Sequence, residues 1–427
     1  MYARADGGST MHSSTSSAGT VSREEWLGVF AAVMFPTVAA CIALAPVISL
    51  GPLDFAMSQS FDLNVSAVGI SFGLCFAAAA VLAGGGGVLA SRFDPTKVVR
   101  VGLVASSAIA GGMAIANSVP FVMVCAILAG AVNGLATPSM NLMITSRVPE
   151  RRRGLAFGLK VGAVPAMATI AAVGGYAVAT TGAPWQVVLW VCAAVGLLSA
   201  GLSLMDRQSR APRRATGRLR ARRTNLRPPV SLVLLSVGGF LGSTATALIA
   251  AFLVDGLIDR GEAPDRASVI VVIVGWAGIV SRVGVGLLSD RWPDARSHLR
   301  TAAVLLLFAS SGMVGLGLGH GEWLLSISAF LAACIGWAWP GLVHHAAIVT
   351  HHERAASATS LMQTGTFAGS FIGPFIFGLI AQHAGFSSAW MFTAMSAVAA
   401  ATLLFLGVAA IGRHPSGLGE EVPYADE

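Results

Sequence analysis

The sequence predicts an all-α membrane protein with twelve transmembrane helices in two pseudo-symmetric six-helix bundles. Three observations lead to this prediction. First, 55% of the 427 residues are hydrophobic and only 11% are charged, whereas a soluble domain carries about 25% charged residues. Second, a strongly basic segment divides two long apolar stretches. Third, loop motifs of the first stretch recur in the second. A chain with so few charges does not cover a water-facing surface, so a soluble fold is excluded.

The chain divides into five segments. Residues 1–22 are rich in Ser, Thr, Gly and Ala and lack the apolar core of a signal peptide, so we expect a disordered cytoplasmic N-terminus. Residues 23–205 and 230–412 are expected to form the two bundles, joined by a basic cytoplasmic linker at 206–229. Residues 413–427 are expected to form a cytoplasmic tail. Each apolar run is near the ~20 residues that a bilayer requires. The expected spans are 26–50, 64–90, 98–117, 120–146, 154–179, 184–205, 230–254, 267–289, 301–319, 322–349, 355–382 and 387–411.

Positive charge predicts the orientation of these spans. Nine arginines stand against a single aspartate in residues 206–229, and short loops rich in arginine stay in the cytoplasm. Of the 27 Lys and Arg residues, only Arg260 and Arg266 fall in loops expected outside. Only Lys160 and Arg282 fall well inside spans, because Arg100 lies at the cytoplasmic end of its span and is counted with the loop. Both termini are therefore expected in the cytoplasm, with the protein in the plasma (inner) membrane. The net charge does not indicate nucleic-acid binding, because the basic residues lie in short loops.

The two apolar stretches also repeat one another. The motif Gly-Val-Leu-Ala-Ser-Arg, which ends at Arg92, is echoed by Gly-Leu-Leu-Ser-Asp-Arg, which ends at Arg291. The basic segment that ends at Arg153 is similarly echoed by the one that ends at Arg354. Each pair is separated by about 200 residues, as expected of parallel repeats in an alternating-access transporter.

These motifs resemble those of the major facilitator superfamily, and the resemblance extends from Trp26 to Ile411. The loop signature of that family is Gly-x-Leu-Ala/Ser-Asp-Arg between helices two and three, with an echo between helices eight and nine. The echo is intact here from Gly286 to Arg291, whereas Ser91 stands where the first copy has aspartate. The resemblance implies a twelve-helix transporter fold and secondary transport of a small solute.

The same resemblance implies a gating motif formed by Gly286, Asp290, Arg291, Arg92 and Arg153. A glycine lets two helices meet at the inner surface, and a carboxylate there can pair with basic groups or a helix N-terminus. The alternative is that Asp290 and Arg291 merely end a helix in water. Because the first copy of the motif lacks the aspartate, the first half is expected to contribute less to closing the gate at the inner surface.

Two basic residues inside the spans are candidates for binding substrate, because an ionisable residue at membrane depth is functional by default. Lys160 either faces a cavity or snorkels back to the interface. Arg282 is similar to the arginine that binds substrate carboxylate in monocarboxylate-type carriers, and its guanidinium offers a planar donor fork. Alternatively, Arg282 braces the inner gate against Asp290. Those carriers often have an aspartate where this chain has Gly278, which puts their proton-coupling pair in doubt.

Polar and aromatic side chains extend the candidate site. His344 shares a helix face with Trp337 and either faces the cavity, where a histidine can titrate near neutral pH, or is a packing residue. His345 points about 100° away on an α-helix, so a metal site formed by the adjacent histidines is not expected. The remaining candidates lie on expected helices four and eleven, where they either line a polar cavity or join helices. They are Asn133, Thr137, Asn141 and Gln363.

The function predicted from these residues is secondary active transport of a small solute by alternating access, and the expected solute is an organic anion such as a monocarboxylate. Two basic groups without an acid at mid-depth make an electropositive cavity. Proton cotransport is one source of energy, although no obvious carboxylate in the spans carries it. We expect a monomer with no cofactor and no metal, and not an enzyme, because no nucleophile–base pair lies at depth. The alternatives are proton-driven efflux of drugs or metabolites and, from another class, a non-transporting membrane sensor.

Overall fold

The computed structural model describes residues 23–149, 152–205, 229–289, 294–351 and 355–411. Eleven helical segments in this part are long and apolar enough to cross a membrane. The last segment, Leu361–Ile411, has 51 residues, about twice the length of one crossing. It is broken at Gly385, whose φ of 82° is a conformation that glycine adopts readily. The protein is therefore a multi-pass, all-helical membrane protein, and the broken segment supplies two of its twelve spans.

The first six spans are formed by α1 to α8, because spans one and five are each broken into two helices. The elements are α1 (Arg23–Ile48), α2 (Leu50–Met57), α3 (Val65–Arg92), α4 (Pro95–Ala114), α5 (Val119–Arg147), α6 (Arg153–Val161), α7 (Ala163–Thr181), α8 (Gln186–Leu202) and the short η2 (Ser203–Met205).

The second six spans are formed by α9 to α15, with breaks in spans seven and ten. The elements are α9 (Val230–Thr246), α10 (Ile249–Asp259), α11 (Pro264–Ser289), α12 (Ala295–Leu318), α13 (Glu322–Phe330), the π-helical turn η4 (Leu331–Ile335), α14 (Pro340–Thr350) and α15 (Ala355–Ile411).

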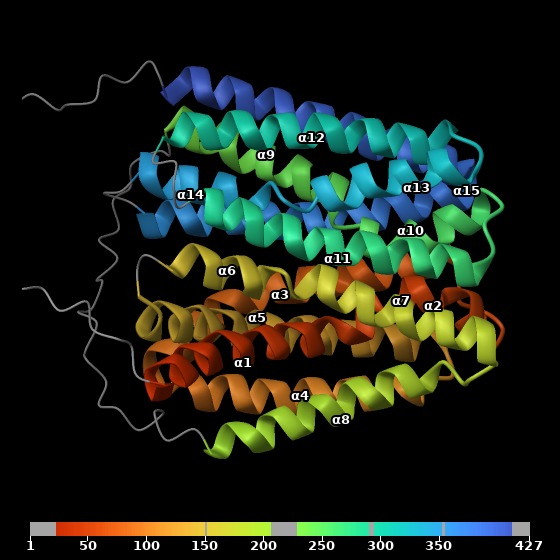
Figure 1. The fold of residues 1–427 in the computed structure, drawn as a ribbon, viewed down its shortest axis with the longest axis horizontal. Helices are drawn as coiled ribbons and strands as arrows, with labels where there is room; N and C mark the ends of the chain where they lie inside the picture. The colour runs from red at the N-terminus through yellow and green to blue at the C-terminus, as the bar shows by residue number, and fades with distance from the viewer. Residues whose placement is uncertain (1–22, 150–151, 206–228, 290–293, 352–354, 412–427) are drawn as a thin grey trace, which may run out of the picture.

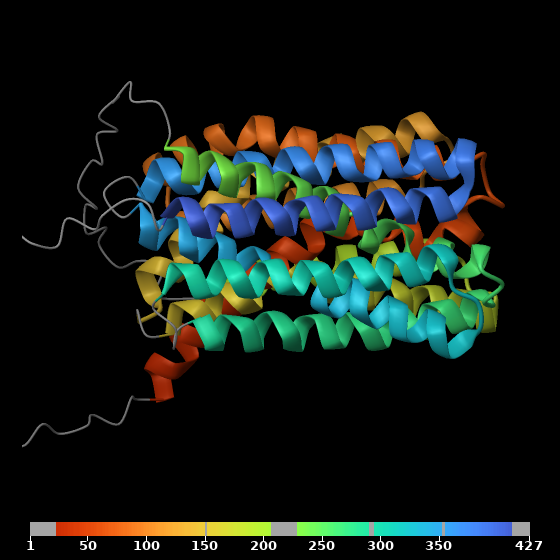
Figure 2. The ribbon, with the colours of Figure 1, turned by 90° about the horizontal axis from the view of Figure 1, so that it is seen from above.

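The helices form two layers that follow the order of the chain. Figure 1 shows α1 to α8 on one side and α9 to α15 on the other, and in Figure 2 the long helices again run along the same axis. The layers meet where α3 packs on α15, α11 on α6 and α7, and α10 on α2. We call the layers the N-terminal and C-terminal halves. The domain boundary predicted at the linker lies outside the described residues and stays a prediction.

In each half, the first helix begins and the last helix finishes on the same side of the molecule. In Figure 1, α1 and α9 begin at the end where α8 and α15 finish. We call this the basic end, because the loops with Arg92, Lys97, Arg147 and Arg296 lie there, and we call the other the opposite end. Basic side chains at this end tie helices together: Arg147 donates to Thr96 Oγ1 at 3.0 Å. An even number of spans follows from this arrangement.

The repeat is visible in the helix caps. Asp94 caps α4 by accepting from the backbone N–H of Thr96 at 2.7 Å. Asp294 caps α12 by accepting from the backbone N–H of Arg296 at 3.1 Å. A backbone hydrogen bond of this kind favours the ionised carboxylate, and the pKa of Asp294 lies below its usual value mainly because of the bond from Arg296. Asp94 and Asp294 are about 200 residues apart, like the repeated loop motifs.

Proline explains the breaks in spans one and five. A proline has no N–H for the carbonyl four residues earlier, so that carbonyl loses its helical partner. Pro52 in this way frees the carbonyl of Ile48, where α1 ends. Pro165 frees the carbonyl of Val161, where α6 ends. The break between α9 and α10 has no proline. There the hydroxyls of Thr244 and Thr246 bond back to carbonyls four residues earlier, a pattern that bends helices.

Glycines hold the helices of each half close together. A Cβ at Gly130 of α5 would lie 1.9 Å from the carbonyl oxygen of Cys75 in α3. A Cβ at Gly369 of α15 would lie 2.0 Å from the carbonyl oxygen of Phe240 in α9. No other residue fits at these distances without moving a backbone. Small residues at such crossings are what membrane helices use in place of a hydrophobic driving force.

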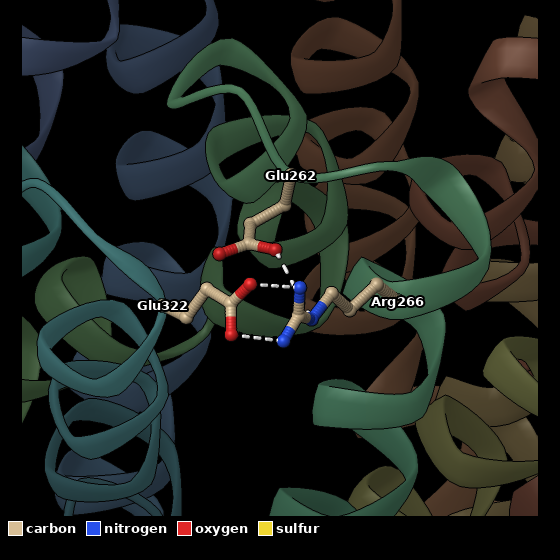
Figure 3. A network of polar contacts seen from close by, with 3 residues as sticks. All are labelled: Glu262, Arg266 and Glu322. Carbon is tan, nitrogen blue, oxygen red and sulfur yellow. Dashed lines mark hydrogen bonds and ion pairs between the residues drawn. The ribbon is translucent and has the colours of Figure 1, made fainter.

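At the opposite end, the two arginines that we expected outside both have polar partners. Arg260 donates to Ser387 Oγ at 2.6 Å. Arg266 donates through both terminal nitrogens to the carboxylate of Glu322, and Glu262 lies 3.6 Å from its Nε. Figure 3 shows this guanidinium between the two carboxylates. These contacts join the start of α11 to the start of α13.

Candidate functional site

Lys160 and Arg282 lie where the two halves cross. Arg282 of α11 donates a hydrogen bond through Nη1 to the carbonyl of Val161 in α6, the residue that follows Lys160. The backbones approach closely here, because a Cβ at Gly158 would lie 3.3 Å from the carbonyl oxygen of Arg282. The structure therefore packs Arg282 against the backbone of the helix that carries Lys160.

The break in span five makes this contact available. Val161 is the last residue of α6, and its carbonyl would normally accept from the backbone nitrogen of residue 165. Because that residue is Pro165, the carbonyl has no partner within its own helix. In a membrane a freed carbonyl has to be satisfied by a neighbouring helix or side chain. The guanidinium of Arg282 fills that role, so a proline in one half positions an arginine of the other.

The positive charge at this crossing has no bonded counter-charge among the described residues. The side chain of Lys160 is half-buried, and no hydrogen bond or ion pair joins it to another described residue. Arg282 is also half-buried, and its Nε is buried without a hydrogen-bond partner. A buried donor without a partner costs roughly 1–3 kcal/mol. The arrangement therefore leaves donor capacity for an anion.

A second pair of candidates lies where α14 meets α15. Nδ1 of His344 is 2.9 Å from the carbonyl oxygen of Pro340, one turn earlier in α14. This bond fixes the ring and leaves Nε2 for other partners. The amide of Gln363 lies close to the ring, but Nε2 is buried and makes no hydrogen bond of normal geometry. Both side chains are half-buried.

His345 lies apart from His344, as the helical geometry predicts. Its Nδ1 is 3.1 Å from Nδ1 of His298 in α12, and the two rings meet edge to face at a centroid distance of 4.7 Å. The adjacent histidines therefore have different surroundings. No group of three or more His, Cys, Asp or Glu in the described part is arranged to hold a metal ion.

Trp337 packs between helices of the C-terminal half. Its Nε1 donates to the carbonyl of Thr246 at 3.2 Å, and a Cβ at Gly278 would lie 2.8 Å from its ring. The side chain is only 3% exposed, which favours packing in this conformation. Gly278 therefore has a structural reason to lack the aspartate of monocarboxylate-type carriers. A role for Trp337 in substrate binding stays a prediction.

The polar row on α5, formed by Asn133, Thr137 and Asn141, contains both buried and half-buried side chains. Asn133 is buried, and Thr137 donates to the carbonyl of Asn133 at 2.7 Å. Thr137 and Asn141 are half-buried, and the side chain of Asn141 has no hydrogen bond with another described residue. Among these three residues, Asn141 is therefore the one whose side-chain amide is most available to a ligand.

Part of the gating motif falls outside the described residues. Asp290 and Arg291 lie there, so their pairing stays a prediction. Gly286 is half-buried in α11 and Arg92 is exposed at the end of α3, and each takes part in a polar interaction. Arg153 begins α6, and its side chain is not described.

The structure also shows a pair of acids that the sequence interpretation did not bring together. The expected spans ended at 50 and 254, which left Asp54 and Asp255 near the ends of helices. Instead, α2 continues to Met57 and α10 to Asp259, so both acids lie inside helices. Asp255 is only 9% exposed. Their separation of about 200 residues, shared with the repeated motifs, is the signal that identifies them as equivalent positions.

Comparisons with known proteins agree with this architecture. The family model described as Major Facilitator Superfamily matches residues 26–318 and 235–424. A search of curated protein sequences found no significant match. Among solved structures, two of a bacterial homolog to the human lysosomal transporter Spinster are similar, one inward-facing and occupied, the other inward-facing and unoccupied. Each has a TM-score of 0.66 at 16% identity, over 92% of this chain and 97% of that chain. At this identity the likeness concerns the fold.

Proposed function

Because the chain belongs to the Major Facilitator Superfamily, we propose that it transports a small organic anion, such as a monocarboxylate, across the membrane. Secondary transport by alternating access is the activity of this family, whose members are transporters rather than enzymes. A fold of this kind serves many substrates, so the substrate class has to be inferred from the site.

The observation that carries the proposal is the crossing of α6 and α11. Lys160 on α6 and Arg282 on α11 come one from each half, and neither has a bonded carboxylate among the described residues. A site formed by both halves changes when the halves move, which is what alternating access requires of a substrate site. Two cations in a medium of low dielectric attract an anion more strongly than they would in water.

The residues have different roles in this proposal. Arg282 provides the planar fork that matches a carboxylate, and Lys160 adds a mobile point charge. His344 and Gln363, which lie together between α14 and α15, contact polar groups of the same substrate. Asn141 presents its unbonded amide from α5. Asn133 and Trp337 are buried and support the site from behind, together with the half-buried Thr137.

The remaining parts of the proposal concern orientation and energy. The basic end faces the cytoplasm, because arginine-rich loops are retained there. The protein then lies in the plasma (inner) membrane with both termini inside, and it acts as a monomer. Proton symport supplies the energy for anion uptake. The competing role for Arg282 is a brace between the halves, since its bond to Val161 joins them.

The proposal is tested by a ligand screen on the purified protein. A ligand that binds only the folded state raises the unfolding temperature by mass action. Each monocarboxylate is compared with its amide and its amine, which have nearly the same shape but not the negative charge. We expect stabilisation by acids and none by the matched amides or amines. Equal stabilisation by an acid and its amide would refute the anion assignment.

Two variants separate binding from bracing. Arg282→Gln is expected to abolish stabilisation by the acid. Arg296→Gln removes an exposed arginine at the basic end and serves as the matched control, which keeps the response. If Arg282→Gln lowers the unfolding temperature without ligand but keeps the full response to acid, Arg282 is a brace and does not bind substrate.

A further inference from the structure

At the opposite end the halves meet through α2 and α10, the outer pieces of spans one and seven. These two short helices pack against each other. A Cβ at Gly51 would lie 1.9 Å from the carbonyl oxygen of Ala251, so the backbones touch at this point. Gly51 and Ala251 are themselves about 200 residues apart, which places the contact at equivalent positions of the two repeats. The contact joins the two halves at the opposite end.

One acid from each half lies beside this contact. Asp54 is on α2, three residues after Gly51, and Asp255 is on α10, four residues after Ala251. Each acid therefore lies about one helical turn beyond the backbone contact on its own helix. Oδ1 of Asp54 and Oδ2 of Asp255 are buried and have no hydrogen-bond partner. Asp255 is nine-tenths buried and Asp54 is half-buried.

The surroundings of the pair are apolar and aromatic. Phe252, three residues before Asp255, stacks on Phe377 of α15 at a centroid distance of 4.6 Å. Phe377 in turn meets Trp390 edge to face at 5.0 Å. Nε1 of Trp390 would lie 2.8 Å from a Cβ at Gly256, the residue after Asp255, and this indole N–H is also buried without a partner. The carboxylates are therefore enclosed where charge is expensive.

No cation compensates the pair within the described residues. The elements packed on α2 and α10 are α1, α3, α7, α11 and α15. Asp259 ends α10, and Arg260 follows it. Arg266 is bound to glutamates, Arg282 to Val161 and Arg260 to Ser387. The other titratable or charged side chains with described positions on these elements form no hydrogen bond or ion pair with either acid. These side chains are Cys41, Cys75, Arg92, Tyr176, Asp259, Arg260, Asp265, Arg266, Arg282 and His383.

We propose that Asp54 and Asp255 form a proton-binding site that controls closure of the opposite end. Two carboxylates that approach in an apolar contact cannot both stay ionised at low cost, so they share one proton. The proton comes from water at the opposite end and is bound by a carboxylate oxygen, which changes the charge of the pair from −2 to −1. One carboxyl group then donates a hydrogen bond to its partner. Loss of the proton restores the repulsion between the halves.

The sign of the pH dependence follows from this scheme. The closed state holds a proton that the open state releases, so low pH favours closure and high pH favours opening. With one proton bound per closure, the ratio of closed to open molecules falls by up to about tenfold for each pH unit. The inference rests on alternating access in this family and is independent of the anion assignment.

The test is a distance measurement between spin labels on the full-length protein in nanodiscs. Thr180→Cys at the end of α7 and Ala263→Cys before α11 are exposed positions on different halves. The five native cysteines are buried, so the label reacts with the introduced ones. We expect the short distance between the labels, which marks the closed state, to dominate at about pH 5. The long distance, which marks the open state, is expected to gain population toward about pH 9. Populations that do not change with pH would overturn the proposal.

Matched variants identify the groups that respond. Asp255→Asn is expected to keep the short distance at every pH, because one ionised acid alone meets no repulsion. Should it fail to fold, Asp54→Asn, at the less buried position, is expected to behave in the same way. Asp259→Asn, an exposed acid one turn later on α10, keeps the response of the parent. A response that persists in both Asp255→Asn and Asp54→Asn, or one that follows the sodium concentration at constant pH, would contradict a proton shared by this pair.

Discussion

Two of the contacts between the halves each carry a pair of like charges, and the pairs differ in how they are satisfied. Where α6 crosses α11, Arg282 has a backbone carbonyl as its partner, and Lys160 is half-exposed. Where α2 crosses α10, the carboxylates of Asp54 and Asp255 have buried oxygens without partners, enclosed by aromatic rings. We call these the basic contact and the acidic contact. The basic contact retains capacity for a ligand of opposite charge, whereas the acidic contact needs a proton.

This difference shows that the contacts between two pseudo-symmetric halves need not be formed by equivalent residues. The acidic contact lies on equivalent positions of the repeat, so each half supplies the same residue. The basic contact does not, because Lys160 is on span five and Arg282 on span eight. We therefore propose substrate recognition at the asymmetric contact and gating at the symmetric one.

The largest expected effect separates the two contacts by their packing. Gly51→Ala would place a Cβ 1.9 Å from a carbonyl oxygen in the acidic contact, whereas Gly158→Ala would place one 3.3 Å from a carbonyl oxygen in the basic contact. The first variant has to separate two backbones, at a cost of about 1–3 kcal/mol, and the second needs only a small adjustment. With the same pair of spin labels, Gly51→Ala is expected to shift the population toward the long distance. Equal behaviour of the two variants would show that the acidic contact is not the tighter one.

The next effect concerns the basic contact alone. Arg282→Gln removes a charged donor fork, and hydrogen bonds to charged groups contribute about 1.5–3 kcal/mol. We expect the dissociation constant of the transported acid to rise by about 10–100-fold. Arg282→Lys keeps the charge without the fork and is expected to fall between the parent and Arg282→Gln. Titration calorimetry measures the three constants, and identical constants for the Lys variant and the parent would exclude recognition by the fork.

A smaller effect is expected from the proline that frees the Val161 carbonyl. Pro165→Ala returns an N–H to that carbonyl, which then competes with Arg282 for it. Since one hydrogen bond contributes a net ~0.5–1.5 kcal/mol, the freed guanidinium is expected to bind the acid a few-fold more tightly. Pro374→Ala in α15 is the control for removal of a helix proline. Binding that weakens strongly in Pro165→Ala, but not in the control, would show that the kink orients Arg282.

The smallest effect is expected from the ion pair at the opposite end. The side chains of Arg266 and Glu322 are 50% and 51% exposed, and exposed pairs contribute less than about 1 kcal/mol. Arg266→Ala should lower the unfolding temperature only slightly and leave the pH dependence of closure unchanged. A lost pH response in this variant would move the proton-sensitive group from the acidic contact to the network in Figure 3.

The fold was predictable from the sequence because a bilayer accepts few structures. Apolar length, arginine in alternate loops and the repeated motifs together predicted twelve spans in two halves, and the family and architecture are confirmed. The breaks within spans were not predicted. Pro52 and Pro165 pointed to them, but the break between α9 and α10 depends on hydroxyl groups that bond to their own helix.

The site was predictable only in part, since helix periodicity does not show which helices meet. Lys160 and Arg282 stood out because charge is rare at that depth, and the structure places them at one contact. Trp337 had the helical spacing of a cavity residue, yet it packs against Gly278. The expected spans ended before Asp54 and Asp255 because an aspartate interrupts an apolar run. Their burial depends on a contact between residues about 200 positions apart, which only the repeat indicates.

Counterflow of a labelled monocarboxylate in proteoliposomes tests the central claim most directly, because it reports exchange through the site without an external driving force. We compare the parent protein with Lys160→Gln and with Lys97→Gln, an exposed lysine at the basic end. The account predicts exchange by the parent and by Lys97→Gln, and a loss of about tenfold or more in Lys160→Gln, as expected when a charged hydrogen bond is removed. Undiminished exchange by Lys160→Gln would contradict it.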